Sequence, residues 1–337
     1  MFELGSLGVI FFFVLSGFLI TYLLLQEKKV TQTVAVKKFY LRRILRIWPL
    51  YYLIVLLGFL VLPHIHFIDN PYLIKFLDTN FAPNFLLYLL FLPNLAFAAF
   101  AAVPHIGQTW SIGVEEQFYV LWPLIVKHSK NILKALLWVI GILITLKVIV
   151  LILYKQMPDN SALKIIKPFL AMTKMESMAI GGIGAYYLFI GNQKIKLLYS
   201  NALLLFSIAM IIVLVYFTPA VIQDGMYLVF SVLFLIIILN VSSNPDCIFK
   251  LENKVFKVLG NISYGIYMYH LIIIAFVFAG LKHFGLQIDD SVISQLIVYT
   301  STILGTVLLA WISYSYFEKW FLDLKHKFTI IKSGSNN

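Results

Sequence analysis

Two neighbouring glutamates, Glu115 and Glu116, open an apolar stretch within the segment TWSIGVEEQFY, residues 109–119. Only 12% of the residues in the chain are charged, and a charged group inside a bilayer costs about 3 kcal/mol on insertion scales. Such a carboxylate is therefore usually paired, hydrated or used in proton transfer. In a low-dielectric site it could act as a base, orient a histidine or hold an acceptor hydroxyl. The structural alternative is a carboxylate that only pairs with a buried basic group.

Two histidines are further candidates for proton transfer. His105 lies five residues before Trp110 and could in principle serve as a base. His270 follows Tyr264 and Tyr267, and the spacing of three places Tyr267 and His270 on one face of a helix. A lone histidine within a membrane more often makes a satisfied contact between helices, so we interpret His270 as a supporting residue.

A third group of candidates is basic. Arg42, Arg43 and Arg46 lie in the segment FYLRRILRIWPLYY, residues 39–52. Arg43 and Arg46 are three apart, so they share a helical face, and guanidinium groups bind phosphate oxygens in a bidentate manner. We predict that the three arginines bind the phosphates of a donor substrate. The alternative is that they anchor the chain to anionic lipid.

The elements that must position these groups are membrane helices. Hydrophobic residues make up 61% of the 337 residues and the mean hydropathy is +0.92, whereas soluble domains are about 45–50% apolar. We predict an all-α, polytopic bundle forming a single membrane domain over residues 1–337, with a basic cytoplasmic tail at residues 322–337. The single cysteine excludes an internal disulfide and a multi-cysteine metal site, and no metal site is predicted. The net charge of +11 indicates a positive-inside bias before it indicates a nucleic-acid partner.

The hydropathy pattern predicts ten apolar segments, and their boundaries are residues 4–25, 49–62, 85–103, 118–126, 135–153, 175–190, 202–217, 226–241, 259–279 and 292–313. The loop at residues 26–46 holds seven basic residues, which makes it cytoplasmic, and the C-terminal tail is cytoplasmic by the same rule. Counting membrane crossings forward from the loop and backward from the tail gives topologies that differ by one crossing. The two counts agree if one segment between the loop and Glu116 enters the membrane and returns on the same side. Residues 85–103 carry Pro93 and Asn94 at their midpoint, so we predict about nine full spans plus one broken or re-entrant segment there. A broken segment at membrane depth must line protein or water.

Two features within the spans have mainly structural interpretations. Gly8, Ser16 and Gly17 are small residues of the first span and permit close approach of another helix. Ser16 is expected to position a group rather than to attack a substrate. Lys147 lies inside an otherwise apolar span, and we expect its side chain to extend toward the outer surface of the membrane.

Together, these segments resemble the membrane-bound acyltransferase family 3, which moves acyl groups, often acetyl, onto carbohydrates and other acceptors at the bacterial envelope. The family signature Trp-Ser-x-x-Val-Glu-Glu-Gln-Phe-Tyr-x-x-Trp-Pro matches residues 110–123 without a mismatch. Three further motifs match in the family's order, at residues 8–20, 42–49 and 262–270. Weaker similarity continues at residues 174–181 and 316–320, where Trp320 replaces a proline of the family pattern.

The resemblance implies an O-acyltransferase of the bacterial inner membrane that takes acetyl from cytoplasmic acetyl-CoA, a co-substrate rather than a bound cofactor, to a carbohydrate hydroxyl. It assigns the donor to Arg42, Arg43 and Arg46 and places Glu115 and Glu116 near the acceptor. Supporting roles fall to Ser16, Gly17, Trp110, Ser111, Tyr119, Tyr264, Tyr267 and His270.

The resemblance also implies a preceding helix with a catalytic histidine, so we expect the N-terminus to be incomplete, or His105 to substitute as the base. Two alternatives remain at this point. One is a transporter or flippase of lipid-linked glycans, which would also need a cavity, broken helices and intramembrane charge. The other is a truncated acyltransferase without catalytic activity.

Overall fold

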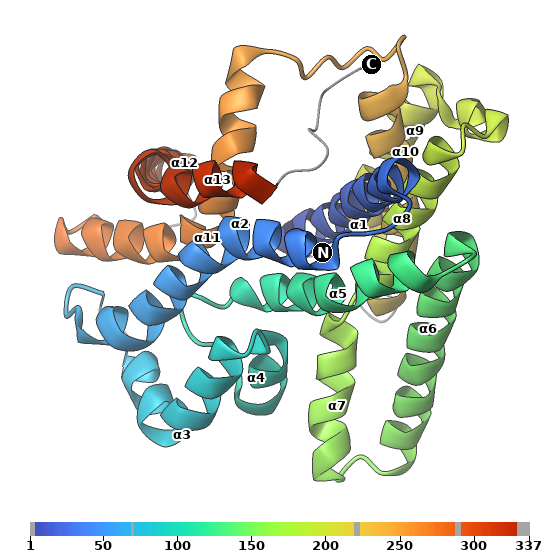
Figure 1. Ribbon diagram of the computed structural model, residues 1–337. Helices are drawn as coiled ribbons and strands as arrows, with labels where there is room; N and C mark the ends of the chain where they lie inside the picture. The colour runs from blue at the N-terminus through green and yellow to red at the C-terminus, as the bar shows by residue number, and fades with distance from the viewer. Residues whose placement is uncertain (1–3, 69–70, 219–222, 287–290, 329–337) are drawn as a thin grey trace. The chain divides into compact units, whose positions relative to one another are not determined.

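The computed structural model describes residues 4–68, 71–218, 223–286 and 291–328. Within these residues every regular element is a helix (Figure 1), which confirms the predicted all-α class. The chain divides into two compact units. Of the described residues, the first unit holds those within 4–36 and 114–252, and the second holds those within 37–113 and 253–328. Each unit is described by itself below.

The helices of the first unit begin where polar side chains can cap them. Asn131, Asn160 and Ser200 each accept a hydrogen bond from a backbone N–H of the following first turn, which satisfies donors that a helix start otherwise leaves unpaired. The unit contains α1 (Leu4–Thr31), most of α5 (Thr109–His128), α6 (Ile132–Gln156), α7 (Ser161–Met172), α8 (Met175–Phe189), η3 (Gln193–Leu198), α9 (Asn201–Phe217) and α10 (Gln223–Ser243).

Helices α1 and α8 pack with their backbones in contact. A Cβ atom added at Gly17 would overlap the carbonyl group of Met178, and one added at Gly181 would overlap the carbonyl group of Val14. Small residues allow membrane helices to approach this closely. The sequence prediction of close helix approach is therefore confirmed at Gly17, whereas a Cβ atom added at Gly8 would meet nothing within 4 Å. Apolar side chains surround the contact, among them Phe18, Ala185, Ile238 and Leu239.

The second unit contains α2 (Val36–Leu56), the π-helix η1 (Leu57–Val61), η2 (Leu62–His64), α3 (Pro71–Leu89), α4 (Pro93–Phe100), the start of α5, α11 (Lys254–His283), α12 (Val292–Ser313), the π-helix η5 (Tyr314–Glu318), α13 (Lys319–Lys325) and η6 (His326–Phe328). Of the predicted tail at residues 322–337, the first seven residues are helical and residues 329–337 lie outside the described residues.

The predicted break in residues 85–103 is present in the second unit. Helix α3 ends at Leu89, and α4 begins at Pro93 after Phe91 adopts a left-handed φ of 57°. Tyr51 and Tyr52 of α2 donate hydrogen bonds to the carbonyl groups of Tyr88 and Leu89, at 2.7 and 3.0 Å. The carbonyl groups freed by the break are thus satisfied by protein, as a break at membrane depth requires.

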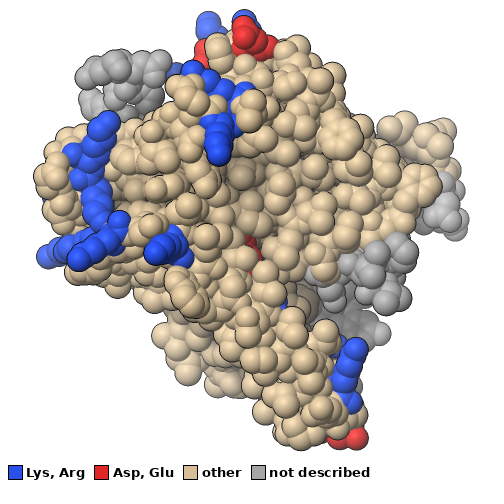
Figure 2. Space-filling model, turned by 90° about the vertical axis from the view of Figure 1, so that its right-hand side faces the viewer, with Lys and Arg blue, Asp and Glu red and all other residues tan. Residues whose placement is uncertain are grey.

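Within the part of the chain that the structure describes, six helical stretches are long and apolar enough to cross a membrane. They are Gly5–Thr31, Val36–His64, Ile132–Gln156, Gly225–Ser243, Lys254–His283 and Val292–Leu324. Helix α9 is apolar but shorter, and α8 has only 15 residues. The predicted count of about nine spans is therefore not confirmed. Figure 2 shows a face covered mostly by uncharged side chains, with lysines and arginines gathered in a few groups, as expected of a surface in contact with lipid.

Candidate active site

Glu115 is held by a chain of hydroxyl groups in the first unit. Its carboxylate, which is 2% exposed, accepts a hydrogen bond from the Tyr119 hydroxyl at 3.1 Å. The same hydroxyl forms a hydrogen bond with Ser16 Oγ on α1. Glu115 and Tyr119 are four residues apart on α5 and so share one helical face. The structure thus brings together three of the residues that the sequence singled out.

Two further contacts fix α5 against α1. Trp122 Nε1 donates to Thr21 Oγ1 at 2.9 Å, and Lys28 Nζ donates to the carbonyl group of Val126 at 2.7 Å. These contacts and the Ser16 contact occur in the same order along both helices, so α1 and α5 run in the same direction. The lysine also lies near the C-terminal end of α5, where the helix dipole favours a cation.

Glu116 is buried, with 7% exposure, but it faces a different direction from Glu115. Consecutive residues of an α-helix are rotated by about 100° around its axis. The two side chains therefore leave α5 in different directions, although both lie on the same turn.

A second set of candidates meets at the start of α5, within the second unit. The Tyr267 hydroxyl donates to the carbonyl group of Gln108 at 2.9 Å and forms a 2.6 Å hydrogen bond with Ser111 Oγ. Gln108 Nε2 donates in turn to the carbonyl group of Met268 at 2.7 Å. Gln108 carried no motif of its own in the sequence, and only its position two residues before Trp110 could have drawn attention to it. These bonds attach the first turn of α5 to α11.

The other aromatic candidates of this unit have supporting positions. The Tyr264 hydroxyl donates to the carbonyl group of Ile47 on α2 at 2.9 Å. His270 Nδ1 donates to the carbonyl group of Tyr267 in its own helix at 2.6 Å. Trp110 is half-buried in the first turn of α5.

His105 lies in the connection between α4 and α5, with a left-handed φ of 65°. Burial lowers the pKa of its imidazole below the ordinary value, because desolvation disfavours the charged form. A neutral imidazole is the form that can accept a proton. His105 belongs to the second unit and the two glutamates to the first, so its role as their partner base stays a prediction.

The three arginines lie on α2 in the second unit, each in a different environment. Arg42 donates to the carbonyl group of Phe328 at 2.9 Å, and the Arg43 guanidinium lies 5.7 Å from the centre of the Phe39 ring. Arg46 is exposed and attracts the buried Glu318 carboxylate electrostatically. Their assignment to donor binding stays a prediction.

Comparison with known proteins decides the family. The family model described as an acyltransferase domain, that of acyltransferase family 3, matches residues 1–315. The chain belongs to this acyltransferase family. The peptidoglycan O-acetyltransferase OatA of Listeria monocytogenes is 27% identical over 287 residues, covering 80% of this chain and 45% of that protein. The O-acetyltransferase OatA of Staphylococcus aureus is 29% identical over 338 residues, covering 93% of this chain and 52% of that protein. The chain spans about half the length of the curated relatives it matches, and no solved structure matches it.

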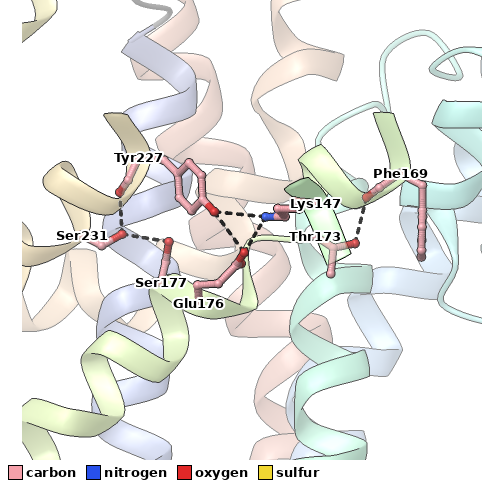
Figure 3. A network of polar contacts seen from close by, with 7 residues as sticks. All are labelled: Lys147, Phe169, Thr173, Glu176, Ser177, Tyr227 and Ser231. Carbon is pink, nitrogen blue, oxygen red and sulfur yellow. Dashed lines mark hydrogen bonds and ion pairs between the residues drawn. The ribbon is translucent and has the colours of Figure 1, made fainter. Parts of the chain in front are cut away.

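This acyltransferase has a second buried polar cluster in the first unit (Figure 3). Lys147 Nζ of α6 lies 2.7 Å from Glu176 Oε1 of α8, and the Tyr227 hydroxyl of α10 donates to the same oxygen at 3.0 Å. Lys147 also donates to the Tyr227 hydroxyl at 3.2 Å. The expectation that Lys147 extends toward the membrane surface is wrong, because an ion pair satisfies its charge inside the protein.

Proposed function

We propose that this protein is an integral membrane O-acetyltransferase that moves an acetyl group from a cytoplasmic acyl-CoA to a hydroxyl of an envelope carbohydrate. The observation that carries the proposal is the match of the acyltransferase model over residues 1–315. Relatives over most of this length are named O-acetyltransferases, and one of them is named for peptidoglycan. The two buried glutamates of α5 supply the carboxylates that such a reaction needs.

In the proposed reaction the acceptor hydroxyl oxygen attacks the thioester carbonyl carbon. A carbon–oxygen bond forms, the carbon–sulfur bond breaks, and the hydroxyl proton passes through a base to the departing thiolate. A positioned base typically contributes about 10²–10⁴-fold to such a step. Glu116 is our candidate for contact with the acceptor, and the Tyr119 hydroxyl bond gives Glu115 a fixed orientation suited to holding the acceptor or a base. His105 is the candidate base among the described histidines outside the spans.

The donor and the acceptor would approach from opposite sides of the membrane. In the proposed topology the basic loop at residues 26–46 and the C-terminus are cytoplasmic, nine segments cross the bacterial inner membrane, and residues 85–103 return without crossing. Arg42, Arg43 and Arg46 would then meet the donor's phosphates on the cytoplasmic side.

A cysteine at the exposed position of Asp323, in a Cys247→Ser background, should react with an impermeant maleimide only in inverted vesicles. Reaction from the outside would reject this orientation.

The decisive experiment is transfer of radiolabelled acetyl from acetyl-CoA in membranes that contain the protein, with cell-wall glycan fragments as acceptor. We expect label in the glycan, its release by mild alkali as an ester, and its loss in Glu116→Gln. Exposed Glu252 offers the matched control, and Glu252→Gln should transfer at the parental rate. Movement of lipid-linked glycan in the absence of any acyl donor would instead support a flippase.

A further inference from the structure

The cluster of Lys147, Glu176 and Tyr227 has features that packing alone does not explain. Glu176 is completely buried and the Lys147 side chain is 18% exposed. Ionisable groups within a membrane are costly and mark functional positions by default. The helix that carries Lys147 is otherwise apolar over its central turns and exposes large side chains such as Trp138, at 68%, and Ile142, at 52%.

A contribution to stability is a weak reason to retain this ion pair. Replacing a buried ion pair by apolar residues of similar size is often neutral or stabilising. Helix α6 also has an apolar contact with α8 that does not involve the pair, because Leu136 packs against Gly182. Glu176 Oε2 has no hydrogen-bond partner within the described part of the chain, so only one of the two carboxylate oxygens is hydrogen-bonded there. What the pair does provide is a directional constraint on the first turn of α8.

The first turn of α8 is followed immediately by the residue that contacts α1. Met178, two residues after Glu176, has its carbonyl group against Gly17. Ser16 precedes Gly17 and forms the hydrogen bond with Tyr119 that continues to Glu115. A displacement of the first turn of α8 would therefore move α1 at the residue that holds the Glu115 chain. Every contact of this route lies in the first unit.

We propose that Lys147, Glu176 and Tyr227 are positioning residues, which fix the first turn of α8 against α1 and thereby set the position of Ser16 and of the Glu115 carboxylate. The proposal rests on the proposed O-acetyltransferase function for its kinetic consequence. The ion pair acts at a distance through the Met178–Gly17 contact, and its two partners do not touch the substrate.

The test is a double substitution that removes both charges together. Lys147→Met with Glu176→Gln keeps side-chain size and leaves no uncompensated charge in the membrane. The matched control is Lys164→Met with Asp159→Asn, which removes the exposed ion pair between Lys164 and Asp159 in the same unit. We expect the double variant to accumulate and melt like the parent, yet to lose about tenfold to a hundredfold in kcat with little change in the KM for acetyl-CoA, because small misplacements of catalytic groups have effects of that size.

A folded double variant with parental kcat would overturn the proposal, since the pair would then be structural only. If the double variant does not fold, Glu176→Asp takes its place, because it keeps the charge and shortens the side chain by one methylene. A lower kcat at unchanged KM supports positioning in that variant, and parental kcat rejects it.

Hydrogen exchange measured by mass spectrometry supplies a readout that does not depend on activity. Peptides covering residues 175–185 and 9–20 should exchange faster in the double variant than in the control variant, because the α1–α8 contact loosens. Unchanged exchange in both peptides would reject the proposed positioning role of the ion pair even if acetyl transfer is altered. If the parent protein transfers no acetyl while the exchange difference is present, the proposed function is wrong, but the ion pair still fixes the first turn of α8 against α1.

Discussion

Buried polar side chains do different work in two regions of this molecule. In the first unit, the Glu115 carboxylate is bound by a hydroxyl group of its own helix, and the Glu176 carboxylate is bound by hydroxyl and ammonium groups of other helices. At the helix break of the second unit, the neutral hydroxyl groups of Tyr51 and Tyr52 bind backbone carbonyl groups instead. The first arrangement is built from ionisable side chains, whereas the second only completes the hydrogen bonding of the backbone.

The difference predicts how each region responds to substitution. A network of side chains in a low-dielectric site fixes the direction of its charges, so its loss should impair chemistry before it impairs folding. A carbonyl group left without a partner at a break costs the free energy of desolvation and should impair folding first. Substitutions that leave size unchanged can separate the two effects.

The largest effect is expected at the α5 carboxylates. Glu116→Gln should lower kcat by about 10²–10⁴-fold, the usual contribution of a positioned acid or base, while the melting temperature in detergent stays near that of the parent. Glu115→Gln should be nearly as severe, and Tyr119→Phe milder, because the phenyl ring removes only the orienting hydroxyl. Parental kcat in Glu116→Gln would show that this region is structural after all.

The sequence predicted the helices well and their polar contacts poorly. Long apolar runs located α6 and α12 within three residues, because a span needs a continuous apolar surface, whereas α1 extends six residues beyond the predicted end at residue 25. Helix α7 was not anticipated, since Lys164, Lys167 and Pro168 interrupt its hydropathy. Pro93 indicated the break, but α3 ends before it, because proline is favoured in the first turn of a new helix.

The contacts of the carboxylates could not be predicted for a physical reason. Ser16 and Tyr119 are 103 residues apart, and the partners Tyr227 and Glu176 are 51 residues apart. No helical periodicity connects residues at such separations, so their pairing depends on how the helices pack. A family pattern marked Ser16, Tyr119 and Glu115 as important without indicating that they touch.

Substitution of Arg43 tests whether the second unit takes part in donor binding. Arg43→Ala should raise the KM for acetyl-CoA by about tenfold or more, since a hydrogen bond to a charged group contributes about 1.5–3 kcal/mol, with kcat and the melting temperature little changed. Arg43→Lys should recover only part of the loss, because lysine cannot bind phosphate in a bidentate manner. An unchanged KM in both variants would remove Arg43 from the donor site.

At the helix break, Tyr51→Phe should lower stability rather than chemistry. Tyr51 is fully buried, and its loss removes one of two donors to the Tyr88 carbonyl group, which still accepts from the Phe91 N–H at 3.2 Å. The expected cost is therefore that of one hydrogen bond, about 0.5–1.5 kcal/mol. Thermal unfolding in detergent should show the loss, and kcat per folded molecule should stay parental. Tyr52→Phe is the matched control and should cost less, because Tyr52 is only partly buried. A fall in kcat at parental stability would contradict the separation of the two regions.

The smallest effect is expected from the titration of His105. Burial lowers the pKa of this imidazole, so the unfolded chain binds a proton here more readily than the folded chain does. The stability that comes with neutral His105 is present above the unfolded pKa of about 6.5 and is lost as the pH falls through that value. Between about pH 7.5 and about pH 5 the parent should therefore lose more thermal stability than His105→Asn.

If His105 is also the base, kcat in the parent should fall only below about pH 6.5, and His105→Asn should lose kcat at every pH. Full activity in His105→Asn would leave the stability prediction intact and exclude this histidine from the chemistry.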